Sequence, residues 1–346
     1  MSDIRFPAPL RTGDLIAVTS PSSGVGPELR PRLDRAVSTL QQRGYAVTVG
    51  RCMDGSGHVS APRSDRRDEL TSMLLDPAVR AIIPPRGGST AIDLLDTLDW
   101  GALAGAEPTW VVGYSDISTL LLPLTLRTGV ATIHGSNLLD TPYEPAPGLR
   151  SWMQIAEQPR GATFAQESPG RYHNGGGPRE WTAGPDATRW PLESAGHWRL
   201  LGGSGDEQVR LDGRLIGGCV ETLSNLAGTP YADTSAFAAR YAPDGLVIYV
   251  EVAGAEADVA CRMLHGMRLA GFFDAANGIL IGRTAAPAIP SLTQDEAVLD
   301  ALGSLRVPII ADVECGHVPP AMPLVNGARA TVVLSGNTGR ATQTLA

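Results

Sequence analysis

The sequence predicts an α/β protein in which parallel strands alternate with helices. Between Asp14 and His134, short apolar runs recur, segments with helical spacing of apolar residues separate them, and glycine-containing turns follow several of the runs. Alternation of this kind is typical of a parallel sheet covered by helices. Ligands of such sheets bind beyond the carboxyl ends of the strands, so the turns that follow the strands are the first place to look for a site.

The elements of the N-terminal half follow from this periodicity. The pattern predicts strands at 15–19, 45–49, 79–83, 110–113 and 131–134. Apolar residues three and four positions apart predict helices at 29–40, from Ser64 through Leu74, at 91–98 and at 117–126. Gly44 is expected to end the first of these helices.

The chain changes character after Leu139. Residues 141–206 are rich in Pro, Gly, Trp and Arg and have little periodicity, which is typical of a linker or a long substrate loop. Beyond them the pattern predicts strands at 213–218, 245–250, 279–281, 307–311 and 328–334, and helices at 221–226 and 257–269. We therefore expect an N-terminal α/β domain over 1–145, a linker with a Trp-bearing substrate loop over 146–206, and a C-terminal domain over 207–346.

The composition excludes several kinds of binding partner and mechanism. The net charge of −8 and the pI near 5.3 argue against a nucleic-acid or anionic-membrane partner, because both require clustered cationic side chains. No lysine occurs in the 346 residues, which excludes a Walker phosphate loop and a Schiff-base mechanism. The beginning of the chain has no secretory pattern, and no run of about eighteen apolar residues is present. We expect a soluble cytoplasmic protein.

No cofactor or metal is expected. The four cysteines, Cys52, Cys219, Cys261 and Cys315, lie far apart in the sequence without a C-x-x-C pair, so neither a disulfide framework nor a thiolate metal site is indicated. The histidines show no H-x-H or H-E-x-x-H spacing.

Ser115 lies where a strand stops and a helix begins. Such a junction lifts a hydroxyl above the edge of the sheet and directs free helical N–H groups toward it, as a serine nucleophile requires. Gly113 lets the chain turn without a clashing Cβ atom. The competing interpretation is that Ser115 only caps the helix, since Ser and Asp are preferred there.

A serine nucleophile needs a base, and the base needs an orienting group. Among the histidines only His134 and His317 follow an apolar strand at a glycine-containing turn, although each could be structural. Glu251 ends an apolar strand, where it could orient the imidazole or cap the turn. An N–H group of Gly87 or Gly88, together with the amide of Asp116, could bind an oxyanion.

Several segments together resemble the serine peptidase family that contains the LD-carboxypeptidases and the microcin C immunity proteins. The matching segments occur in the family's order: Arg86-Gly87-Gly88, Gly113-Tyr114-Ser115-Asp116, His134-Gly135, Gly217-Gly218, Gly228-Thr229-Pro230, Glu251, and Gly316-His317 before Pro323-Leu324. The resemblance implies a flavodoxin-like doubly wound N-terminal domain, a smaller β-rich α+β C-terminal domain and a homodimer.

The resemblance also assigns roles to individual residues. The nucleophile falls on Ser115, the glutamate on Glu251 and the base on His317, so that two domains share the triad, and His134 is left as a structural or pocket residue. The amides of Gly88 and Asp116 are assigned to the oxyanion, and Arg86, Gly87, Trp181 and Trp190 to the substrate. The two tryptophans resemble a pair whose loop stacks a nucleotide base, whereas Cys219 replaces an amide side chain of the microcin branch.

The resulting hypothesis is hydrolysis of an amide that follows an L-residue. The substrate is a peptidyl or aminoacyl nucleotide of microcin type, or alternatively a murein tetrapeptide that loses its terminal D-alanine. An α/β-hydrolase esterase is disfavoured because Ile117 stands where the G-x-S-x-G pattern requires glycine. A non-enzymatic alternative is a small-ligand binding protein in which Ser115 caps a helix over an anion.

Overall fold

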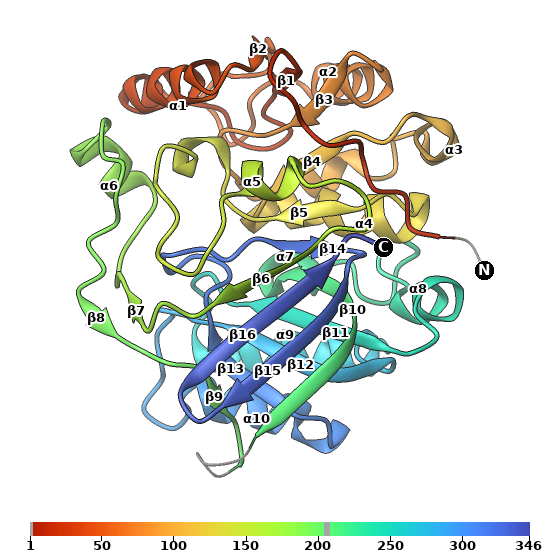
Figure 1. Cartoon of the computed structure of the whole chain (residues 1–346), viewed down its shortest axis with the longest axis vertical. Helices are drawn as coiled ribbons and strands as arrows, with labels where there is room; N and C mark the ends of the chain where they lie inside the picture. The colour runs from red at the N-terminus through yellow and green to blue at the C-terminus, as the bar shows by residue number, and fades with distance from the viewer. Residues whose placement is uncertain (1–2, 204–207) are drawn as a thin grey trace.

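The computed structural model describes residues 3–203 and 208–346, and the expected boundary between residues 206 and 207 lies outside them. Two large sheets lie one above the other in Figure 1, the N-terminal one in red to yellow and the second in green to blue. Among the described residues, no helix is long and apolar enough to cross a membrane.

The N-terminal sheet has the order β14-β5-β4-β3-β1-β2. Its five parallel strands are β1 (Leu15–Val18), β2 (Ala46–Val49), β3 (Val79–Ile82), β4 (Trp110–Gly113) and β5 (Thr132–His134). The order 2-1-3-4-5 is that of flavodoxin-like sheets, which confirms the expected class. The sixth strand, β14 (Leu324–Asn326), comes from the C-terminal part of the chain and pairs antiparallel with β5.

Three of the four predicted helices of this part are present, and a short helix at 100–105 was not predicted. The α-helices are α1 (Arg30–Gln42), α2 (Arg63–Leu75), α3 (Trp100–Gly105) and α4 (Ser118–Thr128), and the short 3₁₀ helices are η1 (Pro27–Leu29), η3 (Ser115–Ile117) and η4 (Leu138–Asp140). The helix expected at 91–98 is wrong in type and length: η2 (Ala91–Leu94) is one 3₁₀ turn, after which the chain turns into α3. Four apolar positions are too few to distinguish a single turn from a longer helix.

The segment before the second domain contributes to two sheets. It contains α5 (Trp152–Ala156), β6 (Thr163–Glu167), β7 (Arg171–Tyr172), α6 (Pro178–Ala183), β8 (Ser194–Ala195) and β9 (Arg199–Leu200). Strands β6 and β9 form the two edges of the second sheet, and β7 pairs with β8 in a two-stranded ribbon.

The second sheet is mixed, with the order β6-β16-β15-β10-β11-β12-β13-β9. Strands β10 (Val209–Cys219), β11 (Leu246–Glu251), β12 (Ala276–Gly282) and β13 (Ile309–Val313) run parallel, whereas β15 (Arg329–Ser335) and β16 (Thr338–Thr344) are antiparallel. The helices are α7 (Val220–Leu223), α8 (Thr234–Tyr241), α9 (Ala257–Leu269) and α10 (Gln294–Leu302), with a closing 3₁₀ turn η5 (Gly303–Leu305).

Helix α4 joins the two parts into one core. It packs against β5 of the first sheet and β10 of the second, and nearly all of its residues are buried. A helix covered on all sides does not need the amphipathic pattern of a surface helix. At its start, a Cβ atom on Gly218 of β10 would lie 2.8 Å from the Ser118 side chain, so the two domains meet without a gap beside the Ser115 turn.

Candidate active site

The backbone of Ser115 adopts a conformation that is uncommon for a side-chain-bearing residue. Its φ angle is +62°, directly after β4 and before α4. The neighbouring turn requires glycine, because a Cβ atom on Gly113 would lie 2.7 Å from Asn137 Oδ1. Such strain persists only where the surrounding structure enforces it, and it is concentrated at functional sites. The junction thus has the geometry of a nucleophile turn.

The imidazole of His317 lies between Ser115 and Glu251. His317 Nε2 is 3.1 Å from Ser115 Oγ, and His317 Nδ1 is 2.8 Å from Glu251 Oε2. Glu251 is the last residue of β11 and is fully buried. Gly316, at φ +104°, leaves room for its carboxylate, since a Cβ atom there would lie 2.5 Å from Glu251 Oε2. The structure thus brings together a hydroxyl, an imidazole and a carboxylate from both domains.

Electrostatics favour a proton on His317 more than in water. Burial lowers the pKa of the imidazole, but the charge of Glu251 and its hydrogen bond outweigh this effect and leave the pKa raised. The hydrogen bond to Glu251 favours a tautomer with the proton on Nδ1, which leaves Nε2 to accept from Ser115.

His134, the other candidate base, lies beside this group. Its side chain is buried at the end of β5, and it packs between Tyr114 and Tyr249 with ring centroids at 6.5 and 5.2 Å. Burial lowers the pKa of His134 to about 4, so the ring is neutral at physiological pH. Its Nε2 atom has no hydrogen-bond partner among the described residues.

The turn after β3 packs directly against Ser115. A Cβ atom on Gly87 would lie 3.0 Å from Ser115 Cβ and 3.1 Å from the amide nitrogen of Asp116. The amide N–H groups of Gly88 and Asp116 donate no backbone hydrogen bond within residues 3–203 and 208–346. They are therefore available to an external acceptor, as an oxyanion site requires.

The carboxylate of Asp116 ties three loops of the N-terminal sheet together. Its Oδ2 atom accepts a hydrogen bond from Ser22 Oγ at 2.6 Å and from the amide of Ala91 at 2.9 Å. A Cβ atom on Gly88 would lie 2.2 Å from the same Ser22 hydroxyl. The loops after β1, β3 and β4 thus converge on one buried carboxylate, at the strand ends where ligands of this fold bind.

A second buried carboxylate, Asp140, connects the Ser115 turn to helix α6. It accepts a hydrogen bond from Tyr114 Oη at 3.1 Å and from Trp181 Nε1 at 2.8 Å. Burial raises the pKa of Asp140 to about 6, although both hydrogen bonds oppose this shift. The ring of Tyr114 meets that of His317 edge-on at 4.9 Å, so this network also fixes one side of the imidazole.

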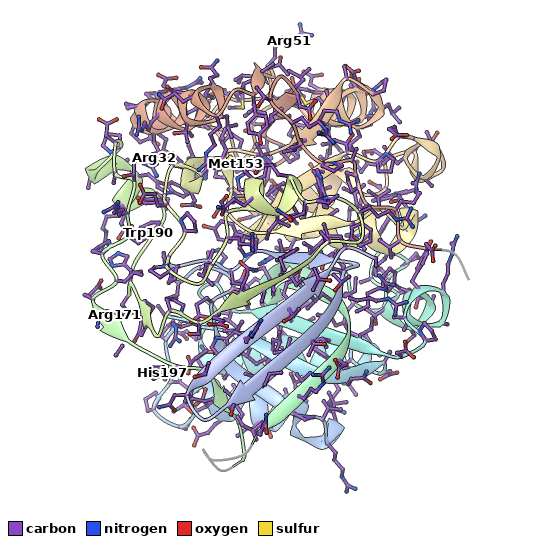
Figure 2. The ribbon with its side chains drawn as sticks, in the orientation of Figure 1. Arg32, Arg51, Met153, Arg171, Trp190 and His197 are labelled. Atoms are coloured by element: carbon purple, nitrogen blue, oxygen red, sulfur yellow. The ribbon has the colours of Figure 1, made fainter. Side chains whose placement is uncertain are left out.

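A pocket opens beside His317. Its lining includes Tyr114, Asp140, Tyr143, Arg150, Trp190 and His317. Trp190 stacks on Tyr143 with ring centroids 3.7 Å apart, and Arg32 lies over the Tyr143 ring at 4.3 Å. Figure 2 shows Arg32 and Trp190 along the same side of the molecule.

The two expected tryptophans lie in different surroundings. Trp190 reaches the pocket, whereas Trp181 is buried and anchors α6 through Asp140. Arg86 is half-buried beside the Gly87 turn and is not part of the pocket lining.

Sequence reasoning missed Tyr114, Asp140 and Arg150 as parts of the site. Arg150 lines the pocket, and within the described chain no carboxylate lies at ion-pair distance from it. Tyr114 lies inside the matched Gly-Tyr-Ser-Asp segment, which is a usable signal. Asp140 and Arg150 lie in stretches without periodicity, so the sequence gives no signal for them.

The comparisons with known proteins identify this two-domain α/β protein as a serine peptidase-type hydrolase. Residues 16–135 match the model of the LD-carboxypeptidase N-terminal domain, and residues 212–332 match that of the C-terminal domain. The chain belongs to the LD-carboxypeptidase family, as the sequence resemblance indicated.

Similar proteins include carboxypeptidases and a self-immunity protein. A putative carboxypeptidase of Streptomyces coelicolor is 28% identical and covers 99% of this chain and 97% of its own. The microcin C7 self-immunity protein MccF of Escherichia coli is 23% identical, with 94% and 92% covered. The murein tetrapeptide carboxypeptidase of Pseudomonas aeruginosa is 28% identical over 69% of this chain and 66% of its own.

Solved structures support the fold. The structure of MccF in complex with glutamyl sulfamoyl guanosine superposes with a TM-score of 0.79 at 21% identity, covering 98% of both chains. An MccF-like protein from Streptococcus pneumoniae, in complex with AMP, gives a TM-score of 0.72 at 18% identity, covering 94% of this chain and 98% of that one. At this identity the likeness concerns the fold alone.

Proposed function

We propose that the protein hydrolyses an amide bond after an L-residue, with Ser115 as nucleophile, His317 as general base and acid, and Glu251 as the group that orients the imidazole. The observation that carries this proposal is the pair of hydrogen bonds at 3.1 and 2.8 Å through His317. Side-chain contacts of this kind between nucleophile, base and orienting group are the signature of a serine triad.

The steps follow from these contacts. His317 Nε2 takes the proton of Ser115 as Oγ attacks the carbonyl carbon, and the amides of Gly88 and Asp116 bind the oxygen that becomes negative. The imidazolium then gives its proton to the amine nitrogen as the C–N bond breaks. Water, deprotonated by His317, releases the acid from the acyl-serine, and the proton returns to Ser115.

For the substrate we propose a small peptidyl or aminoacyl nucleotide. Trp190 and Tyr143 give the pocket beside His317 an aromatic wall, against which a planar base would pack, and Arg150 provides a cation for a phosphate-like group. MccF, whose solved complexes contain aminoacyl sulfamoyl nucleosides, shares the fold.

The second candidate is a murein tetrapeptide that loses its terminal D-alanine. The relative from Pseudomonas aeruginosa bears that name, and Arg150 would equally bind a terminal carboxylate. This substrate has no planar base, so it makes no use of the stacked Trp190 and Tyr143.

Mass spectrometry of products separates these candidates. The purified chain is incubated with an aminoacyl sulfamoyl adenosine and with the tetrapeptide, beside the Ser115→Ala variant as a blank and Trp190→Phe and Trp190→Ala as a matched pair. We expect cleavage of the nucleotide by wild type, retained in Trp190→Phe and reduced in Trp190→Ala. Cleavage of the tetrapeptide alone would establish the second candidate, and no cleavage of either would favour a binding protein.

We also propose the division into domains at 1–145, 146–206 and 207–346, which rests on the change of composition along the chain. The family resemblance further suggests a cytoplasmic homodimer. Light scattering on the purified chain tests the dimer. A single species at the mass of one chain at micromolar concentration would contradict it.

A further inference from the structure

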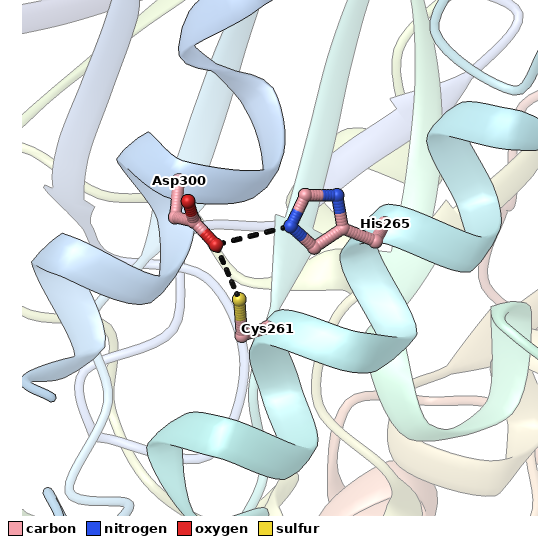
Figure 3. Close-up of side chains that lie close together, drawn as sticks. All are labelled: Cys261, His265 and Asp300. Carbon is pink, nitrogen blue, oxygen red and sulfur yellow. Dashed lines mark hydrogen bonds and ion pairs between the residues drawn. The ribbon is translucent and has the colours of Figure 1, made fainter.

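Helices α9 and α10 bring together three side chains that the amide-hydrolysis chemistry does not use. Cys261 and His265 lie one turn apart on α9, and Asp300 faces them from α10 (Figure 3). No sequence motif marks this group, because its third member comes from another helix 35 residues beyond His265.

The three donor atoms already have nearly the spacing of a metal coordination sphere. Cys261 Sγ lies 3.3 Å and His265 Nε2 lies 3.1 Å from the same oxygen, Asp300 Oδ2, and all three atoms lie within 4.8 Å of one another. Ligands of tetrahedral zinc are separated by about 3.6 Å for sulfur and oxygen and about 3.4 Å for nitrogen and oxygen, given the usual bond lengths. The two contacts to Asp300 Oδ2 therefore have to lengthen by only a few tenths of an ångström to accept an ion, while Cys261 Sγ and His265 Nε2, which lie within 4.8 Å, come to about 3.6 Å from each other.

The surroundings suit a partly exposed ion. Cys261 is 9% exposed and packs with Ala257 and Ala297, whereas the Asp300 side chain is 65% exposed. The closed side holds the thiol in place, and the open side leaves a position for water. Asp258 lies about one turn before Cys261 on α9, so its negative charge also attracts a cation.

An ion would displace the side chain of Arg268 from His265. The Arg268 guanidinium lies 3.3 Å from His265 Nδ1, so in the absence of an ion Nδ1 accepts from Arg268 and Nε2 donates to Asp300. For Nε2 to bind an ion, the ring proton moves to Nδ1 and the Arg268 side chain turns away. The thiol releases its proton to solvent, so binding of one divalent ion releases one proton.

We propose that Cys261, His265 and Asp300 bind one zinc ion or a divalent ion of similar ligand preference, with water in the fourth position. A sulfur, an imidazole nitrogen and a carboxylate oxygen are a donor set that zinc accepts, whereas magnesium and calcium select oxygen alone. The ion joins α9 to α10 and stabilises the C-terminal domain. This proposal stands independently of the proposed hydrolysis.

Cobalt, a spectroscopic substitute for zinc, tests the site. The full-length chain is freed of metal with a chelator and titrated with Co²⁺, then with Zn²⁺. We expect one Co²⁺ per chain, a thiolate-to-cobalt charge-transfer band in the near ultraviolet, and loss of both when Zn²⁺ is added. Wild type and the exposed control His197→Ala should behave alike. In Cys261→Ser the charge-transfer band should vanish. In His265→Ala the affinity for Co²⁺ should fall more than about 100-fold, which exceeds the loss caused by replacing a residue that contacts a metal-binding side chain but not the metal.

Thermal unfolding provides a second readout. Zn²⁺ should raise the melting temperature of wild type and of His197→Ala, because an ion that binds the folded state stabilises that state. It should not raise the melting temperature of Cys261→Ser or His265→Ala. A charge-transfer band that persists in Cys261→Ser, or an equal stabilisation of all four proteins by Zn²⁺, would place the ion elsewhere and overturn the proposal. Absence of any cobalt band in wild type would do the same.

Discussion

His317 Nε2 lies 3.1 Å from Ser115 Oγ, although 202 residues separate the two in the chain. Ser115 follows the fourth strand of the N-terminal sheet, and His317 follows β13 of the second sheet. Neither domain holds both groups, so the proposed hydrolysis depends on the interface between them. Helix α4 and Gly218 form that interface next to the serine, where the two sheets pack closely together.

Replacing Glu251 by Gln should lower kcat by roughly 10³- to 10⁴-fold with little change in KM. The amide nearly preserves the shape of the carboxylate but removes the charge that stabilises the imidazolium. Steady-state kinetics measure kcat and KM, and circular dichroism shows whether the variant is folded. Loss of folded structure, or activity within tenfold of wild type, would argue against the orienting role.

The pH profile should identify the base. Hydrolysis requires neutral His317, and since the pKa of His317 is raised above its usual value of about 6.5, kcat/KM should rise through a pKa above that value. In Glu251→Gln, the limb should move to lower pH, since the carboxylate that raises the pKa is absent. In His134→Gln it should remain, because His134, with its pKa of about 4, does not titrate in that range. A limb that disappears in His134→Gln and persists in His317→Ala would reverse the assignment.

Asp140 should make folding less favourable as pH rises. Its pKa is about 6 in the folded protein against 3.8 in the unfolded chain, so the stabilisation is complete below pH 3.8 and is lost as pH rises through about 6. This difference corresponds to about 3 kcal/mol. Relative to Asp140→Asn, the free energy of unfolding of wild type should fall by up to this amount between pH 4 and pH 7. Denaturant titrations of both proteins at pH 4 and pH 7 measure this change. If the free energies of unfolding of wild type and Asp140→Asn differ by the same amount at both pH values, Asp140 does not titrate as proposed.

Substitution of Gly87 or Gly88, in the turn after β3, by alanine should have a larger effect than substitution of a glycine that faces open space. In Gly87→Ala, the new methyl group would lie about 3.0 Å from Ser115 Cβ, so we expect kcat to fall at least tenfold with a small loss of stability. In Gly88→Ala, the methyl group would displace Ser22 from Asp116 and lower both activity and melting temperature. Gly105→Ala is the matched control, since a Cβ atom there meets nothing within 4 Å. Unchanged kinetics in Gly87→Ala would remove this turn from the site.

Local patterns predict most of the N-terminal half, because its strands are apolar runs and several of them lead into glycine-containing turns. The antiparallel strand β16 was not predicted, since four of its seven residues are Thr or Gln and its alternation of exposed and buried positions gives no apolar run. The doubly wound order was implied by family resemblance and then confirmed by the strand order.

The sequence predicts the candidate site residues that lie in the segments matching the family, and it misses those that lie elsewhere. Ser115, Glu251 and His317 lie at or shortly after the ends of apolar strands, positions that the pattern of the sequence marks. Asp140 is different: its importance comes from Tyr114 and Trp181, which lie 26 and 41 residues away and reach it only in the folded chain. Cys261 and Asp300 are likewise brought together by helix packing, which periodicity along one segment does not encode.

Covalent labelling shows whether Ser115 is the nucleophile. The wild-type chain, treated with a fluorophosphonate and digested, should yield one modified peptide carrying the label on Ser115. His317→Ala should label at least about 100-fold more slowly, because its serine lacks a base, and Ser115→Ala should not label at all. A label on another residue, or a wild-type chain that stays unmodified while folded, would rule out Ser115 as the nucleophile.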